Sequence, residues 1–168
     1  MRGIIASVVM LAIWPCLVTA DEWPAAKVQH VFSGNGQHFV RIVPGEGYGD
    51  TVGFKGSKTG PYARGEFYEK QPDRSYRLIA DVALQNPVAP VDVLLSNRGY
   101  VVTFDNWHNA GYGKVVAIYR PNGELVRTYE LEALYASKQR EAIPTSVSSR
   151  WWRCRPFGFV DPDKQTKV

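Results

Sequence analysis

The chain has 168 residues, a formal net charge of +4 and an aromatic content of 12%. This length suits one domain, and the many aromatic residues together with mixed charges exclude a disordered chain. The small positive balance is spread along the sequence. It therefore does not predict binding to nucleic acid, which requires a concentrated basic surface.

Residues 1–20 have the pattern of a secretory signal peptide. They contain no acidic residue, a single arginine at Arg2, and small residues before Asp21. Such a leader is removed, and no second long apolar run follows, so we expect no membrane span after processing. The sequence predicts a secreted or periplasmic protein with one β domain over 21–160 and a polar tail over 161–168.

Removal of this leader would discard Cys16 and leave Cys154 as the only cysteine. An intramolecular disulfide would then be impossible. A lone cysteine in an oxidising compartment is either buried and inert or paired with another chain, and burial is the default expectation.

Four stretches have the pattern of β-hairpins, with runs rich in Val, Ile, Phe and Tyr on both sides of a turn. In the first, Asn35-Gly36 lies in the turn, and both residues tolerate a positive φ. The four predicted pairs of strands are 28–32 with 39–43, 65–69 with 76–84, 91–95 with 101–104, and 115–119 with 125–131.

The hairpins repeat in pairs. Ser33-Gly34-Asn35-Gly36 aligns with Ser96-Asn97-Arg98-Gly99, which divides the chain into two four-stranded units at about 28–84 and 91–131. These units resemble the blades of bacterial secreted and periplasmic β-propellers. Two blades cannot close a ring, so the resemblance implies two sheets that pack face to face or stay open, without the propeller's central-channel site. The chain also resembles an uncharacterised bacterial secreted family, a likeness that implies no function.

One short helix is predicted over about 131–142, because Leu131, Leu134 and Tyr135 share a face and Pro144 follows. The segment 148–154 is rich in strand formers and is expected to add a last strand. The predicted fold is therefore all-β, with two four-stranded antiparallel blade-like units and one short C-terminal helix.

The glycine-rich segment 44–60 matches neither a phosphate-binding loop nor a dinucleotide fingerprint in its spacing. We interpret it as a surface loop between two hairpins, and we expect no cofactor.

The loop 105–113 has the highest density of chemically active side chains. It carries Asp105, Asn106, Trp107, His108, Asn109 and Tyr112. The carboxylate and amides could hold a cation, through Asp105 and Asn109 above all, but their order does not match a calcium loop and no metal is expected. Alternatively, the imidazole and carboxylate could form an acid/base pair.

A third interpretation of this loop is ligand binding. Trp107 and Tyr112 could stack on a sugar ring or a peptide, while Asn106 and Asn109 supply hydrogen bonds. The structural alternative is that the amides close turns and that Trp107 fills the end of the core.

The segment 150–157 combines three arginines with three aromatic rings. Trp and Arg are enriched in binding hot spots, which makes Arg150, Trp152 and Arg153 candidate ligand-binding residues. In a secreted protein this composition suits a partner protein or an acidic glycan. Strand alternation would place Trp151 and Trp152 on opposite faces.

The sequence contains no G-x-S-x-G elbow, no H-E-x-x-H pair and no Cys/His cluster, so it favours a non-catalytic role. The favoured function is a secreted or periplasmic β domain that binds a protein or glycan partner in the cell envelope. Two alternatives stay open. One is a small hydrolase or lyase that uses His108 and Asp105, and the other is a purely structural repeat domain that assembles with another chain.

Overall fold

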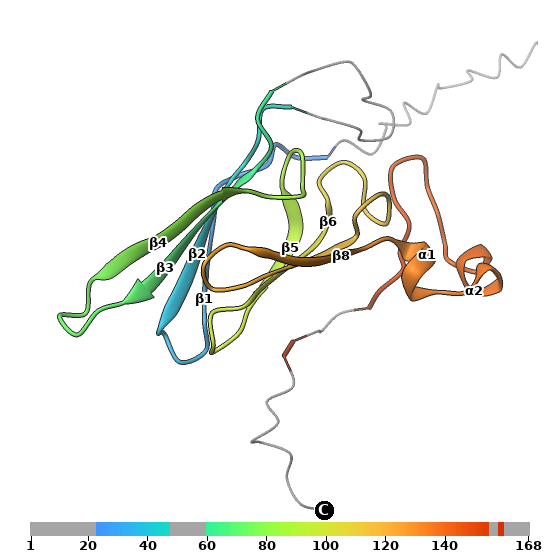
Figure 1. Cartoon of the computed structure of the whole chain (residues 1–168). Helices are drawn as coiled ribbons and strands as arrows, with labels where there is room; N and C mark the ends of the chain where they lie inside the picture. The colour runs from blue at the N-terminus through green and yellow to red at the C-terminus, as the bar shows by residue number, and fades with distance from the viewer. Residues whose placement is uncertain (1–22, 48–59, 155–157, 160–168) are drawn as a thin grey trace, which may run out of the picture.

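The computed structural model describes residues 23–47, 60–154 and 158–159. In this part of the chain, eight strands form two four-stranded antiparallel sheets, followed by two short helical turns (Figure 1). Strand order follows chain order in both sheets, and neither sheet closes on itself. The predicted all-β fold with two open four-stranded units is confirmed. The predicted leader, the centre of the glycine-rich loop (48–59) and the tail 161–168 lie outside the described residues.

All four predicted hairpins are present. The first sheet consists of β1 (Gln29–Phe32), β2 (His38–Val43), β3 (Arg64–Lys70) and β4 (Tyr76–Ala83). The second consists of β5 (Pro90–Leu95), β6 (Val101–Asn106), β7 (Val116–Tyr119) and β8 (Leu125–Tyr129). The two units predicted from the aligned turns are therefore two separate sheets.

The aligned turns of the two units lie side by side. Gly36 and Gly99 hold the equivalent turn position, with φ of 65° and 81°. Such left-handed backbone suits glycine because it has no Cβ. The backbone nitrogen of Asn35 donates to Asn97 Oδ1 at 2.9 Å, and this hydrogen bond joins the two turns.

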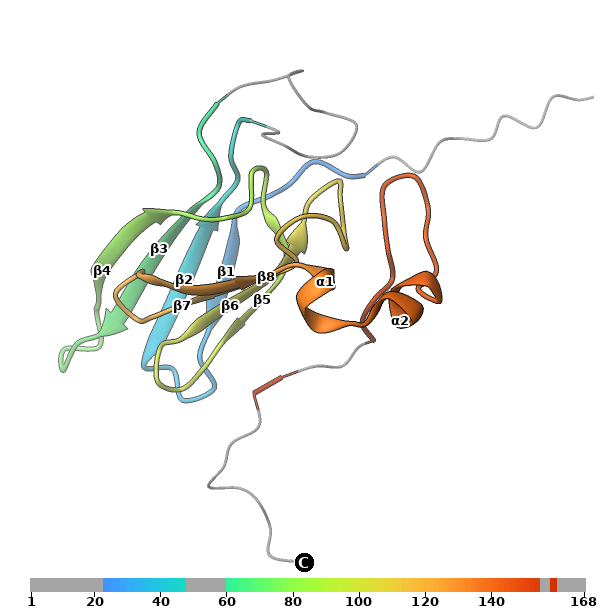
Figure 2. The ribbon, with the colours of Figure 1, turned by 45° about the vertical axis from the view of Figure 1, so that its right-hand side comes forward.

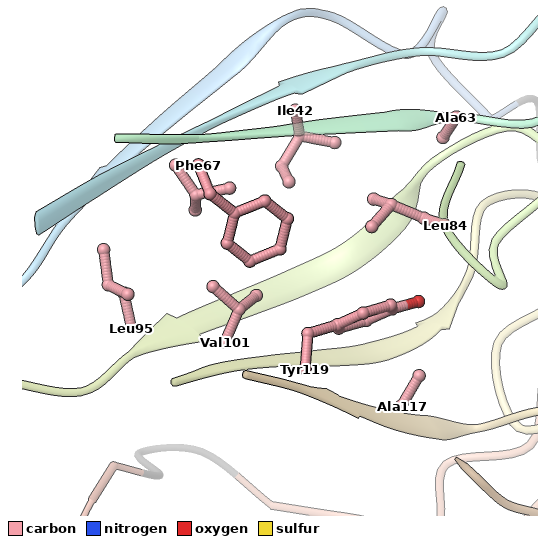
Figure 3. Close-up of a cluster of buried hydrophobic side chains, with 9 residues drawn as sticks. Ile42, Ala63, Phe67, Leu84, Leu95, Val101, Ala117 and Tyr119 are labelled. Atoms are coloured by element: carbon pink, nitrogen blue, oxygen red, sulfur yellow. The ribbon is translucent and has the colours of Figure 1, made fainter. Parts of the chain in front are cut away.

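The main core lies between the two sheets (Figure 3). Alternate residues of a strand point to opposite faces, so Val40 and Ile42 of β2 face inward while Arg41 faces outward to Glu66. Tyr119 contributes its ring to this core, and its hydroxyl accepts a hydrogen bond from the backbone nitrogen of Gln85 at 2.8 Å. Burial raises the pKa of Tyr119 to about 12. The buried members of the cluster are Val40, Ile42, Ala63, Phe67, Leu84, Leu95, Val101, Ala117 and Tyr119.

A second apolar cluster covers the other face of the second sheet. Leu131, Tyr135, Ile143 and Trp152 from the C-terminal segment pack there against residues of β6, β7 and β8. Figure 2 shows the two helical turns, α1 (Leu131–Leu134) and α2 (Ser137–Glu141), following β8. The C-terminal segment therefore acts as a third layer.

The expected single helix over 131–142 is broken into α1 and α2. Tyr135 (φ −136°, ψ 138°) and Ala136 (φ −65°, ψ 156°) between them have extended backbone. The Tyr135 hydroxyl donates to the Trp152 carbonyl at 3.1 Å, and the two rings meet edge to face. The break turns Tyr135 toward the tail, a long-range contact that outweighs local helix preference.

The expected last strand over 148–154 was wrong. Ser149 and Arg150 form only isolated bridges, to Ala110 and Thr145. The backbone amides of this segment donate to loop carbonyls and not to a sheet edge, since Arg150 N bonds Ala110 O and Trp151 N bonds Pro144 O. The default expectation that Cys154 is buried was also wrong, because this residue is exposed.

The outer face of the first sheet carries a row of aromatic side chains. Phe32, Phe39 and Tyr68 come from three neighbouring strands, and the rings of Phe39 and Tyr68 stack at 4.2 Å between centroids. Phe32 is 56% exposed, so this row faces solvent at its β1 end.

Candidate functional site

The backbone of loop 105–113 has positive φ at four positions, two of which are not glycine. Asp105 and His108 have φ of 57° and 70°, and Gly111 and Gly113 also have positive φ. A non-glycine residue in this region costs on the order of 1–3 kcal/mol and persists only where surrounding contacts impose it. Contacts with surrounding residues therefore hold Asp105 and His108 in this conformation.

The loop amides close the turn. Asn106 Nδ2 donates to the Tyr112 carbonyl at 3.0 Å, and Asn106 Oδ1 accepts from Asn86 Nδ2 at 3.1 Å. Asn109 is buried, and its Nδ2 donates to the His108 carbonyl at 2.6 Å. These contacts match the structural interpretation of the two loop amides.

The carboxylate of Asp105 lies at the centre of the site and is almost fully buried. Its Oδ1 accepts hydrogen bonds from the Gly111 amide at 2.8 Å and from Trp152 Nε1 at 2.7 Å. Its Oδ2 accepts from Arg153 Nε at 2.9 Å. One side chain thereby fixes the loop and the tail relative to each other.

Arg153 joins this carboxylate to a second one. Its Nη2 lies 2.5 Å from Asp92 Oδ2, on β5, while its Nε bonds Asp105. The guanidinium also lies over the Phe104 ring, 5.0 Å from the centroid. Side-chain exposures of 17% for Asp92, 16% for Arg153 and 4% for Asp105 place this network largely out of water. Buried charges of this kind are tolerated only when they are paired and hydrogen-bonded.

The loop and the tail approach each other most closely at Gly111. A Cβ added there would lie 2.5 Å from Arg150 Cβ and 2.6 Å from the Arg150 carbonyl oxygen. Beside this contact, the Arg150 guanidinium lies 4.4 Å from the centroid of the Tyr112 ring. The glycine is therefore required for the close approach that positions Arg150.

The segment before β1 forms a third wall. Trp23 packs edge to face on Trp107 at 5.5 Å between centroids, and its Nε1 donates to Ser148 Oγ at 3.3 Å. Trp107 Nε1 in turn donates to the Pro24 carbonyl at 2.8 Å. Three segments that are distant in the sequence therefore meet at one place.

These segments line a pocket of about 350 Å³, which we call the Trp–Arg pocket. Its lining residues are Trp23, Pro24, Val91, Asp92, Asp105, Ala110 and 149–153. The volume lies within the range typical of small-ligand sites. Three tryptophans, two arginines and two aspartates contribute to the lining, so the pocket combines aromatic surface with charge.

The structure brings some of the predicted site residues into this pocket and leaves others outside it. Asp105, Arg150, Trp152 and Arg153 line it. The Tyr112 ring lies against the Arg150 guanidinium, and the Trp107 ring packs edge to face with that of Trp23. Asn106 and Asn109 stabilise the turn. Ligand binding by any of these residues stays a prediction.

His108 is not among the residues that line the described pocket. Its ring lies 6.0 Å from that of Trp23 in an edge-to-face arrangement. The three donors described above occupy both oxygens of Asp105, so the carboxylate is engaged by the tail and by Gly111. The acid/base pair stays a prediction that this geometry does not favour.

Burial lowers the pKa of His108 from its ordinary value of 6.5. Between the folded and unfolded pKa values the unfolded chain binds more protons, so the free energy of unfolding rises with pH there. The stability linked to neutral His108 is present above pH 6.5 and is lost as the pH falls through the folded pKa. We expect His108→Asn to flatten this part of the pH dependence in urea unfolding between pH 7 and pH 5. Exposed His30→Asn serves as the control, and an unchanged slope in the His108 variant would contradict the expectation.

Sequence reasoning missed seven of the eleven lining residues, and three of the seven, Trp23, Asp92 and Trp151, carry an aromatic or charged side chain. Trp23 lies just after the predicted leader. Asp92 is the one polar residue of the otherwise apolar strand β5, which is a local signal of a buried charge. Trp151 was noted for its position only, yet it lines the pocket and is 57% exposed. The inward carboxylate of Asp92 was the one signal that pattern analysis could have used.

Within residues 23–47, 60–154 and 158–159, no group of three or more His, Cys, Asp or Glu side chains is placed to hold a metal ion. Over the same ranges, no helix has the length and apolar character to cross a membrane. Comparison of the chain with family models, with curated proteins and with solved structures finds no match, so the geometry of the site is the basis for assigning a function.

Proposed function

We propose that the mature chain is a secreted or periplasmic, non-catalytic domain that binds a ligand in the Trp–Arg pocket. The secreted location rests on the leader pattern of residues 1–20. The binding role rests on one observation: three distant segments form a pocket whose inner charges are already paired, while an indole ring at its rim is 57% exposed.

The paired inner charges support binding over catalysis. Asp105 and Arg153 engage each other and their neighbours, so they provide a fixed floor and not a reactive group. A rigid floor reduces the entropy lost when a ligand is ordered against it. Trp and Arg are among the residue types most enriched in binding hot spots, and Trp151 and Arg150 both line this pocket.

The proposal is tested with the purified mature chain and three probes: an N-acetylglucosamine tetramer, tetragalacturonate and an acidic pentapeptide. Calorimetric titration should detect binding of at least one probe. Trp151→Ala should weaken that binding by about tenfold or more, because Trp151 lines the pocket and tryptophan is among the residue types most enriched in hot spots.

Phe32→Ala is the matched control, because Phe32 has nearly the same exposure as Trp151 and lies on the outer face of the first sheet. Its affinity for the same probe should equal that of the unmodified chain. Binding of none of the probes, or equal weakening by both substitutions, would contradict the proposed site.

A further inference from the structure

We propose that the ligand of the Trp–Arg pocket is a saccharide that bears a carboxylate, with its sugar ring against the indoles and its carboxylate on Arg150. This inference rests on the proposed function and names the ligand class of the same site.

The two arginines of the pocket differ in what they have left to offer. Arg153 already pairs with Asp92 and Asp105, at 2.5 and 2.9 Å. Arg150, in contrast, has no ion pair with any carboxylate in the described part of the chain, and its guanidinium lies over the Tyr112 ring at 4.4 Å. Stacking uses the face of a guanidinium and leaves its N–H edge for a planar, two-oxygen acceptor. Arg150 is therefore the cation that fits a ligand carboxylate.

The net charge of the lining sets the number of anionic groups. Two aspartates and two arginines line the pocket, so its formal charge is zero before a ligand binds. A neutral site of this kind suits one carboxylate better than a phosphate or a run of anions, which require an excess of positive charge.

Two of the three indoles that line the pocket have their N–H groups engaged within the chain, so these N–H groups are not left for a ligand. Trp152 Nε1 donates to Asp105 and Trp23 Nε1 donates to Ser148, so both N–H groups are satisfied within the chain. The face of an indole carries partial negative charge and attracts the weakly positive C–H groups of an apolar surface. A pyranose ring presents such C–H groups on one face and hydroxyls at its edge.

Main-chain recognition of a peptide is disfavoured at this place. The backbone amides of Arg150, Trp151 and Trp152 all donate to carbonyls of the chain itself, at 2.8, 3.0 and 3.1 Å. A bound peptide strand obtains much of its affinity from backbone hydrogen bonds. Recognition in this pocket therefore depends on side chains, which suits a sugar ring with a charged substituent.

The test compares tetragalacturonate with its fully methyl-esterified form, which has the same rings but no charge. Calorimetric titration of the unmodified mature chain should give an affinity for the acid at least about tenfold higher than for the ester. Because this comparison needs no substitution, it is independent of the stability of any variant.

Variants at Arg150 then assign the difference. Arg150→Gln keeps the backbone bond to Ala110 and should remove the preference for acid over ester by lowering the affinity for the acid to about that for the ester. Arg150→Lys should restore only part of the preference, because an ammonium lacks the planar fork. The thermal unfolding of each variant is recorded as the fold control.

The possible failures are distinguishable. Equal affinity for acid and ester, or a preference that survives in Arg150→Gln, overturns the carboxylate assignment and leaves a sugar-binding pocket intact. Tighter binding of the acidic pentapeptide than of tetragalacturonate, with loss in Arg150→Gln, overturns the saccharide class in favour of a peptide. Binding of none of the probes overturns both this inference and the proposed function.

Discussion

Asp105→Asn is expected to lower the free energy of unfolding by about 3–5 kcal/mol, the range measured when one member of a buried ion pair is removed. The carboxylate accepts hydrogen bonds from Gly111, Trp152 and Arg153 at once. An asparagine amide has only one oxygen, so in either orientation its NH₂ group meets an N–H donor. Arg153 would also lose the more deeply buried of its two carboxylates.

Asparagine is the informative replacement because it tolerates the positive φ of 57° at this position. The backbone strain at this position is therefore nearly the same in the variant, and the measured loss of unfolding free energy reflects the loss of the carboxylate. Asp92→Asn is the graded control, since Asp92 is more exposed than Asp105 and leaves Arg153 its inner partner. Urea unfolding of both variants measures the difference. A loss below about 1 kcal/mol for Asp105→Asn would show that the carboxylate does not hold loop and tail together.

The hairpins could be predicted because their signals are local. Gly36 and the equivalent Gly99 occupy left-handed turn positions, and β2 and β6, which follow these turns, alternate between buried and less buried residues. Turn chemistry of this kind needs no knowledge of the rest of the chain. The division into two sheets follows from the same signals, because the aligned turns fix where each unit begins.

The third layer could not be predicted, because it depends on contacts between distant residues. The residues over 131–142 do favour a helix locally. However, the Tyr135 hydroxyl donates to the Trp152 carbonyl, and the helix breaks at Tyr135. The strand formers in the tail likewise predict a strand, whereas the Arg150 and Trp151 amides bond loop carbonyls. In both cases a tertiary contact outweighs an intrinsic preference.

The sequence indicated two of the segments that form the candidate site. Composition singled out both the loop 105–113 and the arginine–tryptophan segment, because binding residues are disproportionately found on loops and Trp and Arg are enriched in binding hot spots. Composition does not say that the two meet. For Trp107 and the loop amides the sequence allowed both a ligand-binding and a structural interpretation, and the structure shows contacts of these side chains within the chain, to Pro24 and to neighbouring backbone.

Gly111→Ala is expected to cost at least about 3 kcal/mol and to release the tail from the loop. The residue has a φ of 79°, where an L side chain costs on the order of 1–2 kcal/mol. The added Cβ would in addition lie 2.5 Å from Arg150 Cβ and 2.6 Å from the Arg150 carbonyl oxygen. Backbone atoms cannot rotate away as a flexible side chain does, so residues 149–153 must shift and weaken the bonds from Trp152 and Arg153 to Asp105.

Gly36→Ala separates the two causes. Gly36 also has a positive φ, 65°, but no atom lies within 4 Å of the Cβ that would be added. Its cost in urea unfolding should therefore be the backbone term alone, about 1–2 kcal/mol, with no change in hydrogen exchange at 149–153. In Gly111→Ala, exchange of the Arg150 and Trp151 amides should accelerate, because their bonds to Ala110 and Pro144 open when the tail is displaced. Equal stability losses in the two variants, with protection of the tail amides retained in both, would show that the close approach at Gly111 does not hold the tail in place.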